Sequence, residues 1–288
     1  MKHAEQGCRI RLNKSAFFCY KKNMNIRDID ESFCKRLSIF FADIDDTITT
    51  KGRIPASTFQ AMWELKKNGI KFVPVTGRPA GWCDMIARMW PVAGVVGENG
   101  AFYYAYDEEN RKFIRRYVDS DEKRAESRKK LQRLRERVLA EVPGCGIASD
   151  QEFRTADLAI DFCEDVERLS EDKINRICEI AKEEGTTAKI SSIHVNCWYG
   201  DYSKVSCFNT FINDFTGKSL DELQEEIIYA GDSPNDEPMF KALKHSVAVA
   251  NIRNFLDRIE SKPKYITENE SGEGFYEAVK IILEKRNR

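Results

Sequence analysis

The sequence predicts an α/β protein, with a Rossmann-like parallel-sheet core that is interrupted by an inserted α+β domain. Two short stretches, residues 39–42 and 226–230, the second apolar after Glu226, have the pattern of strands buried on both faces of a parallel sheet. Each run is followed by acidic residues, and open α/β sheets bind their ligands at the carboxyl ends of strands. Strand and helix patterns alternate with short links on both sides of a long middle stretch, as in βαβ units.

The helices and strands in the first half of the core are predicted from hydrophobic periodicity and from residues that begin or end helices. Apolar side chains at helical spacing predict a helix that Gly69 terminates, and Pro79 suits the first turn of the next helix. The predicted order is strand 39–42, helix 57–68, strand 71–75, helix 82–89 and strand 93–96.

The middle of the chain lacks the strict βαβ alternation, which then returns. The middle stretch is predicted as strand 112–118, charged amphipathic helix 121–142, half-exposed strand 156–162, helix 174–184 and strand 188–198. The second half of the core is predicted as helix 205–215, strand 226–230, helix 239–243, strand 246–250 and helix 276–285.

These patterns divide the chain into three parts. We expect residues 37–106 and 200–288 to form the α/β core and residues 107–199 to form the α+β insert. Residues 1–36 are predicted to be a peripheral N-terminal extension with the start of a short helix at 29–33, and Met24 is an alternative first residue.

Charge and cysteine content exclude several classes of function. The formal net charge of −1 favours neither nucleic acid nor an anionic membrane as a partner. The nine cysteines are scattered without a Cys-x-x-Cys pair, which is typical of reduced thiols in a cytoplasm. No apolar run approaches the length of a membrane span. We therefore expect a cytoplasmic protein that binds neither nucleic acid nor membrane; its oligomeric state is not predicted.

The strongest functional signal is the group of carboxylates that follows strand 39–42. Strand alternation places Asp43 and Asp45 on the same side of the chain and turns Ile44 into the protein. Two carboxylates that close repel each other unless a cation lies between them or one keeps its proton. Mg²⁺, which prefers oxygen ligands and often accompanies phosphate, suits this position. A solvated acidic turn is the alternative interpretation.

Four separate segments place chemically suitable side chains at the same edge of the sheet. A carboxylate can attack phosphorus, a second acid can move protons, and a hydroxyl and an ammonium can hold phosphoryl oxygens. Phosphoryl transfer needs this combination because its uncatalysed rate is so low that several groups must act together. The residues concerned are Asp43 and Asp45, Thr76, Lys204, and Asp232 with Asp236.

These motifs resemble those of the haloacid dehalogenase-like phosphatase superfamily. The first motif, Asp-x-Asp-x-Thr, matches residues 43–47; the second matches Thr76 and the third Lys204. The fourth, Gly-Asp-x-x-x-Asp, matches residues 231–236. The resemblance covers about residues 37–285, and a large α+β insert between the second and third motifs is similar to the cap of the Cof-like, type IIB branch.

The resemblance implies a role for each matching residue. Asp43 would be the nucleophile and Asp45 the general acid and base. Lys204 would neutralise Asp43 and hold the phosphoryl group together with Thr76, Gly77 and Asn235.

The resemblance also implies a Mg²⁺ site. Its ligands would be Asp43, the main-chain carbonyl of Asp45, and Asp232, with Asp236 supporting them or binding directly. Asp46 is a departure, because many relatives have Gly at this position; the change leaves the implied chemistry intact.

The function predicted from these residues is a Mg²⁺-dependent phosphatase that acts on a small phosphorylated metabolite, with a sugar phosphate as the favoured class. A phosphosugar mutase is the alternative enzyme. A catalytically silent sugar-phosphate-binding protein is the alternative of another class, although the presence of Asp43 and Asp45 argues against it.

Substrate contacts are expected from the insert and from two core loops. A strand over residues 191–199 would place Ile193, Val195 and Cys197 on an apolar face packed against the insert's helices. Its other face would point to the substrate, with solvent as the alternative. The substrate candidates are Ser192, His194, Asn196 and Trp198 on that face, with Arg78 and Asn99 in the core.

Overall fold

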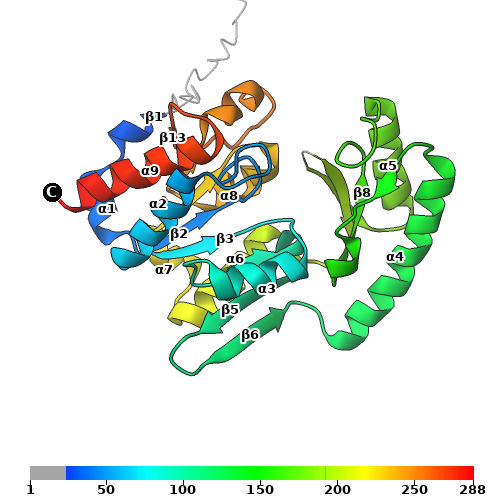
Figure 1. The fold of residues 1–288 in the computed structure, drawn as a ribbon, viewed down its shortest axis with the longest axis horizontal. Helices are drawn as coiled ribbons and strands as arrows, with labels where there is room; N and C mark the ends of the chain where they lie inside the picture. The colour runs from blue at the N-terminus through cyan, green and yellow to red at the C-terminus, as the bar shows by residue number, and fades with distance from the viewer. Residues whose placement is uncertain (1–23, 192) are drawn as a thin grey trace, which may run out of the picture.

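The computed structural model describes residues 24–191 and 193–288, and it confirms the predicted fold class. Figure 1 shows an α/β core joined to a separate lobe that contains α4 and α5. The core sheet has six parallel strands in the order β1-β13-β12-β11-β2-β3. These strands are β1 (Met24–Asn25), β2 (Ile39–Ala42), β3 (Lys71–Pro74), β11 (Ile227–Gly231), β12 (Ser246–Ala248) and β13 (Tyr265–Ile266).

Strand β2 is central because its side chains alternate between the two hydrophobic cores of the α/β part. Phe40 packs in the cluster on one face of the sheet, and Phe41 packs in the cluster on the other. All four residues of β2 are buried, which confirms the prediction of a strand covered on both faces.

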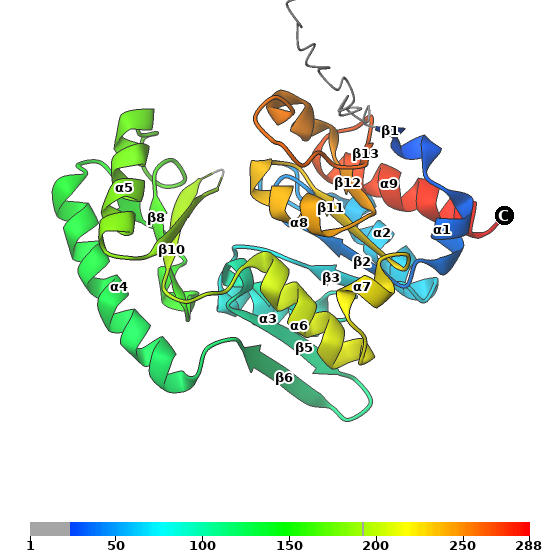
Figure 2. The same cartoon turned by 180° about the vertical axis from the view of Figure 1, so that it is seen from behind.

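Helices cover both faces of this sheet, as the two opposite views in Figures 1 and 2 show. Helix α9 packs against α1 and α2 on one face, and α6 packs against α7 and α8 on the other. The first group is α1 (Glu31–Arg36), α2 (Ala56–Lys67) and α9 (Ser271–Arg286); the second is α6 (Lys204–Thr216), α7 (Leu220–Leu223) and α8 (Glu237–Ala242). The short 3₁₀ helices are η1 (Ile26–Asp28), η2 (Glu98–Gly100), η3 (Gln151–Phe153), η4 (Pro234–Asp236) and η5 (Ala250–Phe255).

A three-stranded antiparallel sheet extends the core beyond β3. It contains β4 (Val95–Gly97), β5 (Phe102–Asp107) and β6 (Lys112–Tyr117), and a bridge between Val75 and Val96 joins it to the main sheet. Helix α3 (Ala80–Met89) packs on β4 and β5. The expected boundary at residue 107 therefore falls inside the β5–β6 hairpin, and the separate lobe begins with α4 at Asp121.

Residues 24–36 belong to the core, which corrects the prediction that residues 1–36 form a peripheral extension. Strand β1 pairs with β13, and α1 packs against α9. Phe33 is almost completely buried, and Arg286 donates hydrogen bonds to the carbonyls of Cys34 and Leu37. The predicted short helix is confirmed as α1. Residues 1–23 lie outside the described part of the chain.

We call residues 121–198 the insert. Its antiparallel sheet has the order β7-β8-β10-β9 and packs against α4 and α5. The elements are α4 (Asp121–Glu141), β7 (Gly146–Ile147), β8 (Asp157–Asp161), α5 (Glu171–Glu183), β9 (Thr187–Ile190) and β10 (His194–Trp198).

Two details of the insert differ from the prediction. Every residue of β8 is buried, so the strand is not half-exposed. The predicted strand over 188–198 is a hairpin, because β9 ends at Ile190 and β10 begins at His194. Val195 and Cys197 pack in the hydrophobic core of the insert, as predicted. Among the described residues, no helix is long and apolar enough to span a membrane.

The role of residues 24–36 in the core can be tested with Phe33→Ala. This change removes a fully buried ring that stacks on His245, so we expect the free energy of unfolding to fall by about 3–5 kcal/mol. Urea denaturation measures the change. The control is Lys35→Ala on the exposed side of α1, which should change stability by less than ~0.5 kcal/mol. Equal stability of Phe33→Ala and wild type would contradict the correction.

Candidate active site

Three buried carboxylates meet at the carboxyl ends of β2 and β11. The register pairs Ala42 with Ala230, and the N–H of Asp43 donates to the carbonyl of Ala230 at 3.0 Å. The chain therefore leaves both strands side by side, which brings Asp43 next to Asp232. One carboxylate oxygen from each of Asp43, Asp232 and Asp236 lies within 4.8 Å of the others. The structure thus brings these three predicted residues together in a geometry that can hold a metal ion.

Lys204 supplies a positive charge to this cluster. It is the first residue of α6, and its Nζ lies 2.7 Å from Oδ1 of Asp43 and 3.5 Å from Oδ1 of Asp236. Burial lowers the pKa of Lys204, but Asp43 and Asp236 raise it by more, so its pKa lies above the usual value. The ammonium is therefore charged at neutral pH.

One ammonium does not compensate three buried carboxylates. Burial raises the pKa of Asp43 to about 7, because the effect of Lys204 is opposed by Asp236 and Asp45. Burial, together with Asp236 and Asp43, also raises the pKa of Asp232 well above its usual value. A divalent cation would relieve this repulsion, so the chemistry of the donor set fits a hard, oxygen-seeking metal.

Hydrogen bonds hold the Asp236 carboxylate in place. Its Oδ1 accepts from the hydroxyl of Tyr229 at 2.5 Å, and its Oδ2 accepts from the N–H of Asp232 at 2.9 Å. Gly231 makes this approach possible, because a Cβ at that position would lie 2.5 Å from the Asp236 carboxyl carbon.

The loop after β2 explains the unusual residue in the first motif. Asp46 has φ = +56°, a conformation that favours Gly and that Asp adopts more readily than most residues. Its N–H donates to Oγ1 of Thr49 at 3.0 Å. Thr47 is fully buried and donates to Oδ1 of Asp232 at 3.2 Å. The first motif is therefore bound directly to the fourth.

The loop after β3 carries two of the predicted phosphate ligands, Thr76 and Gly77. Thr76 is fully buried, and its Oγ1 accepts from the N–H of Arg78 at 3.0 Å. Asn99 packs against Gly77, since a Cβ on Gly77 would lie 3.2 Å from the Asn99 amide. Within the described chain, Nδ2 of Asn99 is buried and lacks a hydrogen-bond partner. Asn235, in η4, is partly exposed.

Comparison with known proteins identifies the family. A model of haloacid dehalogenase-like hydrolases matches residues 40–140 and 210–279, which is more than half of the chain. The protein belongs to the haloacid dehalogenase-like hydrolase family. The resemblance noted from the four motifs is thereby confirmed.

Individual relatives agree with this assignment. A phosphoglycolate phosphatase of Methanobrevibacter smithii is 25% identical over 252 residues, which cover 84% of this chain and 97% of that protein. A putative COF-like hydrolase from Plasmodium vivax has a TM-score of 0.63 and 18% identity, covering 88% of this chain and 99% of its own. A sucrose-phosphatase from Synechocystis has a TM-score of 0.58 and 15% identity, covering 86% and 98%.

The two solved structures show the shared fold. The predicted activity, that of a phosphoric monoester hydrolase, agrees with the family and with the phosphatases among its relatives.

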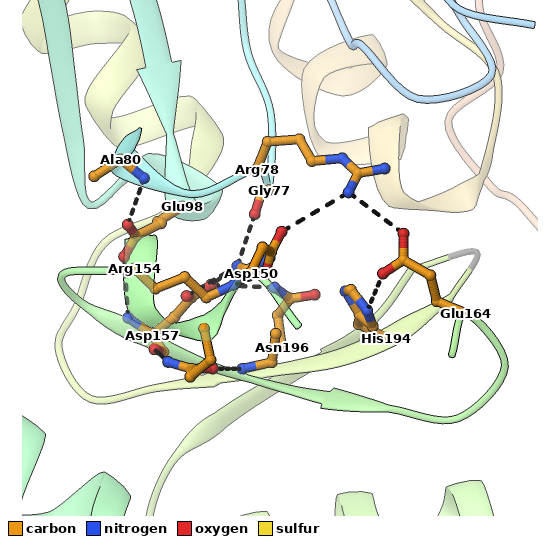
Figure 3. Close-up of polar contacts among 12 residues, drawn as sticks. Gly77, Arg78, Ala80, Glu98, Asp150, Arg154, Asp157, Glu164, His194 and Asn196 are labelled. Carbon is orange, nitrogen blue, oxygen red and sulfur yellow. Dashed lines mark hydrogen bonds and ion pairs between the residues drawn. The ribbon is translucent and has the colours of Figure 1, made fainter. Parts of the chain in front are cut away.

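In this haloacid dehalogenase-like hydrolase, Arg78 connects the core to the insert. Its Nε and Nη2 bind both oxygens of Asp45 at 2.8–3.1 Å, and its guanidinium stacks on Trp82. Its Nη1 points to the insert and lies 3.9 Å from Asp150 and 3.8 Å from Glu164 (Figure 3). The sequence indicated Arg78 as a substrate contact but gave no sign of this link.

Sequence reasoning missed Glu98, which fastens the insert to the core. Its buried carboxylate accepts hydrogen bonds from the backbone N–H groups of Ala80 in the core and of Thr155, Ala156 and Asp157 in the insert. Figure 3 shows this carboxylate between the two parts. Glu98 directly follows β4, so its strand-end position was the available signal.

Arg154 makes the reciprocal contact from the insert. Its side chain is 1% exposed, and its Nη1 donates to the carbonyl of Gly77 at 3.0 Å and to Asp157. Its Nε donates to Asp150 at 2.9 Å. The insert is therefore hydrogen-bonded to the same loop that carries Thr76.

The predicted substrate residues of β10 are all buried rather than exposed to solvent. His194 lies 2.9 Å from Glu164, an ion-pair distance without hydrogen-bond geometry. Asn196 donates to Asp157 at 3.1 Å, and Trp198 stacks on Tyr202. Asn196 and Trp198 thus have partners at the junction between insert and core. Ser192, the fourth residue of this face, lies outside the described chain.

The role of Glu98 can be tested with Glu98→Ala. Four backbone N–H groups would lose their acceptor, so we expect the free energy of unfolding to fall by at least ~3 kcal/mol. The control is Glu152→Ala, an exposed acid of the insert, which should cost less than ~0.5 kcal/mol. Similar urea midpoints for the two variants would show that Glu98 does not fasten the insert.

Proposed function

We propose that this protein is a Mg²⁺-dependent phosphatase that hydrolyses a small phosphorylated metabolite, with a sugar monophosphate as the favoured class, through a phospho-aspartyl intermediate. The observation that supports it most is the pairing of Asp43 with Lys204 inside the buried cluster of Asp43, Asp232 and Asp236. A nucleophilic carboxylate needs such neighbours when it approaches a phosphate dianion.

The first step breaks the ester bond. A carboxylate oxygen of Asp43 attacks phosphorus, the bond between phosphorus and the leaving oxygen breaks, and Asp45 gives its proton to that oxygen. Lys204 keeps the attacking carboxylate oriented through its 2.7 Å contact. Arg78 holds Asp45 by both oxygens and so sets the position from which the proton is delivered.

The second step releases phosphate. Asp45 takes a proton from a water molecule, the water oxygen attacks phosphorus, and the bond from phosphorus to Asp43 breaks. The hydroxyl of Thr76, the N–H of Gly77, the ammonium of Lys204 and the amide of Asn235 are the proposed contacts of the phosphoryl oxygens.

The metal ion in this proposal is Mg²⁺. Asp43, Asp232 and the main-chain carbonyl of Asp45 would hold it, with Asp236 orienting them through its bond to the Asp232 N–H. When bound, Mg²⁺ neutralises charge that spreads over the phosphoryl oxygens.

The substrate and the compartment complete the proposal. The relatives include, by name, a phosphoglycolate phosphatase and a sucrose-phosphatase, so leaving groups in the family range from a small carboxylate to a sugar. The buried thiols of Cys34, Cys83, Cys197 and Cys207 suit a reducing compartment, and we propose the cytoplasm.

Asp43→Asn tests the nucleophile. The variant keeps the volume of the side chain but removes the attacking oxygen, so kcat for p-nitrophenyl phosphate should fall by about 10³-fold or more. Asp165→Asn, on the exposed surface of the insert, is the matched control and should keep wild-type turnover. Substantial activity in pure Asp43→Asn would exclude the assignment.

Metal removal tests the carboxylate cluster. EDTA should abolish hydrolysis, Mg²⁺ should restore it, and Ca²⁺ should not, because Ca²⁺ takes more ligands at longer distances. Asp232→Asn should raise the Mg²⁺ concentration for half-maximal activity by at least ~10-fold. A variant with wild-type Mg²⁺ dependence would place the ion elsewhere.

A further inference from the structure

We propose that Asp150 and Glu164 determine the substrate class, because they accept hydrogen bonds from hydroxyl groups of the leaving group and repel a second anionic group on it. The substrate is then a phosphate monoester of a neutral polyol, and carboxylated phosphate esters are disfavoured. This inference rests on the proposed phosphatase function.

The two carboxylates come from different segments of the insert and meet at one point. Asp150 precedes η3, and Glu164 lies in the turn after β8. Both face Nη1 of Arg78 (Figure 3). The other nitrogens of this guanidinium bind Asp45. One guanidinium therefore lies between Asp45 and two acidic groups of the insert. Because Asp45 is the proposed proton donor to the leaving oxygen, we place the leaving group beside these acids.

The charge around this guanidinium is negative. Arg78 carries one positive charge, whereas Asp150 and Glu164 together carry two negative charges, before any charge on Asp45 is counted. The neighbouring cation, Arg154, is already bound by Asp150, Asp157 and the carbonyl of Gly77. Burial and Arg154 also lower the pKa of His194, so its imidazole is neutral at pH 7. A carboxylate on the leaving group would meet net negative charge here.

The same groups have free acceptor capacity. The distances of 3.9 Å and 3.8 Å from Arg78 exceed hydrogen-bond length, so the Arg78 guanidinium does not saturate Oδ2 of Asp150 or Oε1 of Glu164. Oδ2 of Asp150 accepts one hydrogen bond, from Nη2 of Arg154 at 3.3 Å, which leaves it a further lone pair. A carboxylate offers about four lone-pair positions. The Glu164 side chain is 32% exposed and can therefore be reached by a ligand. Hydroxyl groups, which donate, satisfy these oxygens without adding charge.

The test compares two esters that share a three-carbon skeleton and differ at one end. Glycerol 3-phosphate ends in a hydroxymethyl group, and 3-phosphoglycerate ends in a carboxylate. Each ester is measured as a substrate with Mg²⁺ and, separately, as an inhibitor that competes with p-nitrophenyl phosphate. The competition assay gives the preference between the two esters even if their own turnover is slow. We expect wild type to prefer glycerol 3-phosphate by at least ~10-fold in kcat/KM or in the competition constant.

Neutralising the insert's acids should shift this preference. Glu164→Gln keeps the size of the side chain and removes its charge, so it should reduce the preference by about 10-fold and improve the binding of 3-phosphoglycerate in absolute terms. Asp150→Asn should act in the same direction. Because Asp150 is buried, the melting temperature of this variant is compared with that of wild type to show that it is folded. Glu167→Gln, an exposed acid of the same turn, is the matched control and should leave the preference unchanged.

The outcomes separate this inference from the proposed function. If Mg²⁺-dependent hydrolysis of p-nitrophenyl phosphate is absent, or survives Asp43→Asn, the phosphatase proposal itself fails. If that hydrolysis is present but wild type binds 3-phosphoglycerate as well as glycerol 3-phosphate, the inference is overturned. It is equally overturned if folded Glu164→Gln and Asp150→Asn keep the wild-type preference.

Discussion

The repulsion among three buried carboxylates is the constraint on which the candidate site depends. Asp43, Asp232 and Asp236 come together because β2 and β11 are neighbours in register and both end at the same edge of the sheet. Burial removes the water that would otherwise screen their charges. Lys204, which reaches the cluster from the first turn of α6, compensates part of its charge. The remaining charge makes the cluster suited to bind a cation.

Several local features follow from that constraint. Gly231 leaves space for the Asp236 carboxyl, and Tyr229 and the N–H of Asp232 hold it in place. The positive φ of Asp46 turns the chain back so that Thr47 can donate to Asp232. These contacts hold the carboxylates in place beyond the ends of the strands before any ligand binds, which is what an electrostatic site needs in order to act without reorganising.

The core site could be predicted from the sequence because its signals are local. Asp43, Thr76 and Asp232 each follow a short apolar strand, and parallel strands end at one edge, so their convergence required only the strand assignments. The junction between core and insert could not be predicted in this way. Glu98, Arg154, Asp150 and Glu164 acquire their partners only when the insert packs on the loop after β3. The role of residues 24–36 was missed because β1 has only two residues, too few for a periodic pattern.

The central claim is that Asp43 becomes covalently phosphorylated. The most direct measurement is rapid acid quenching of the full chain during turnover of p-nitrophenyl phosphate with Mg²⁺, followed by mass spectrometry of the peptide that contains residues 37–51. The account predicts a phosphoryl group on this peptide, attached to Asp43, that forms and decays at the rate of turnover. A phosphoryl group on another residue, or full turnover with no phosphorylated peptide at any quench time, would contradict it.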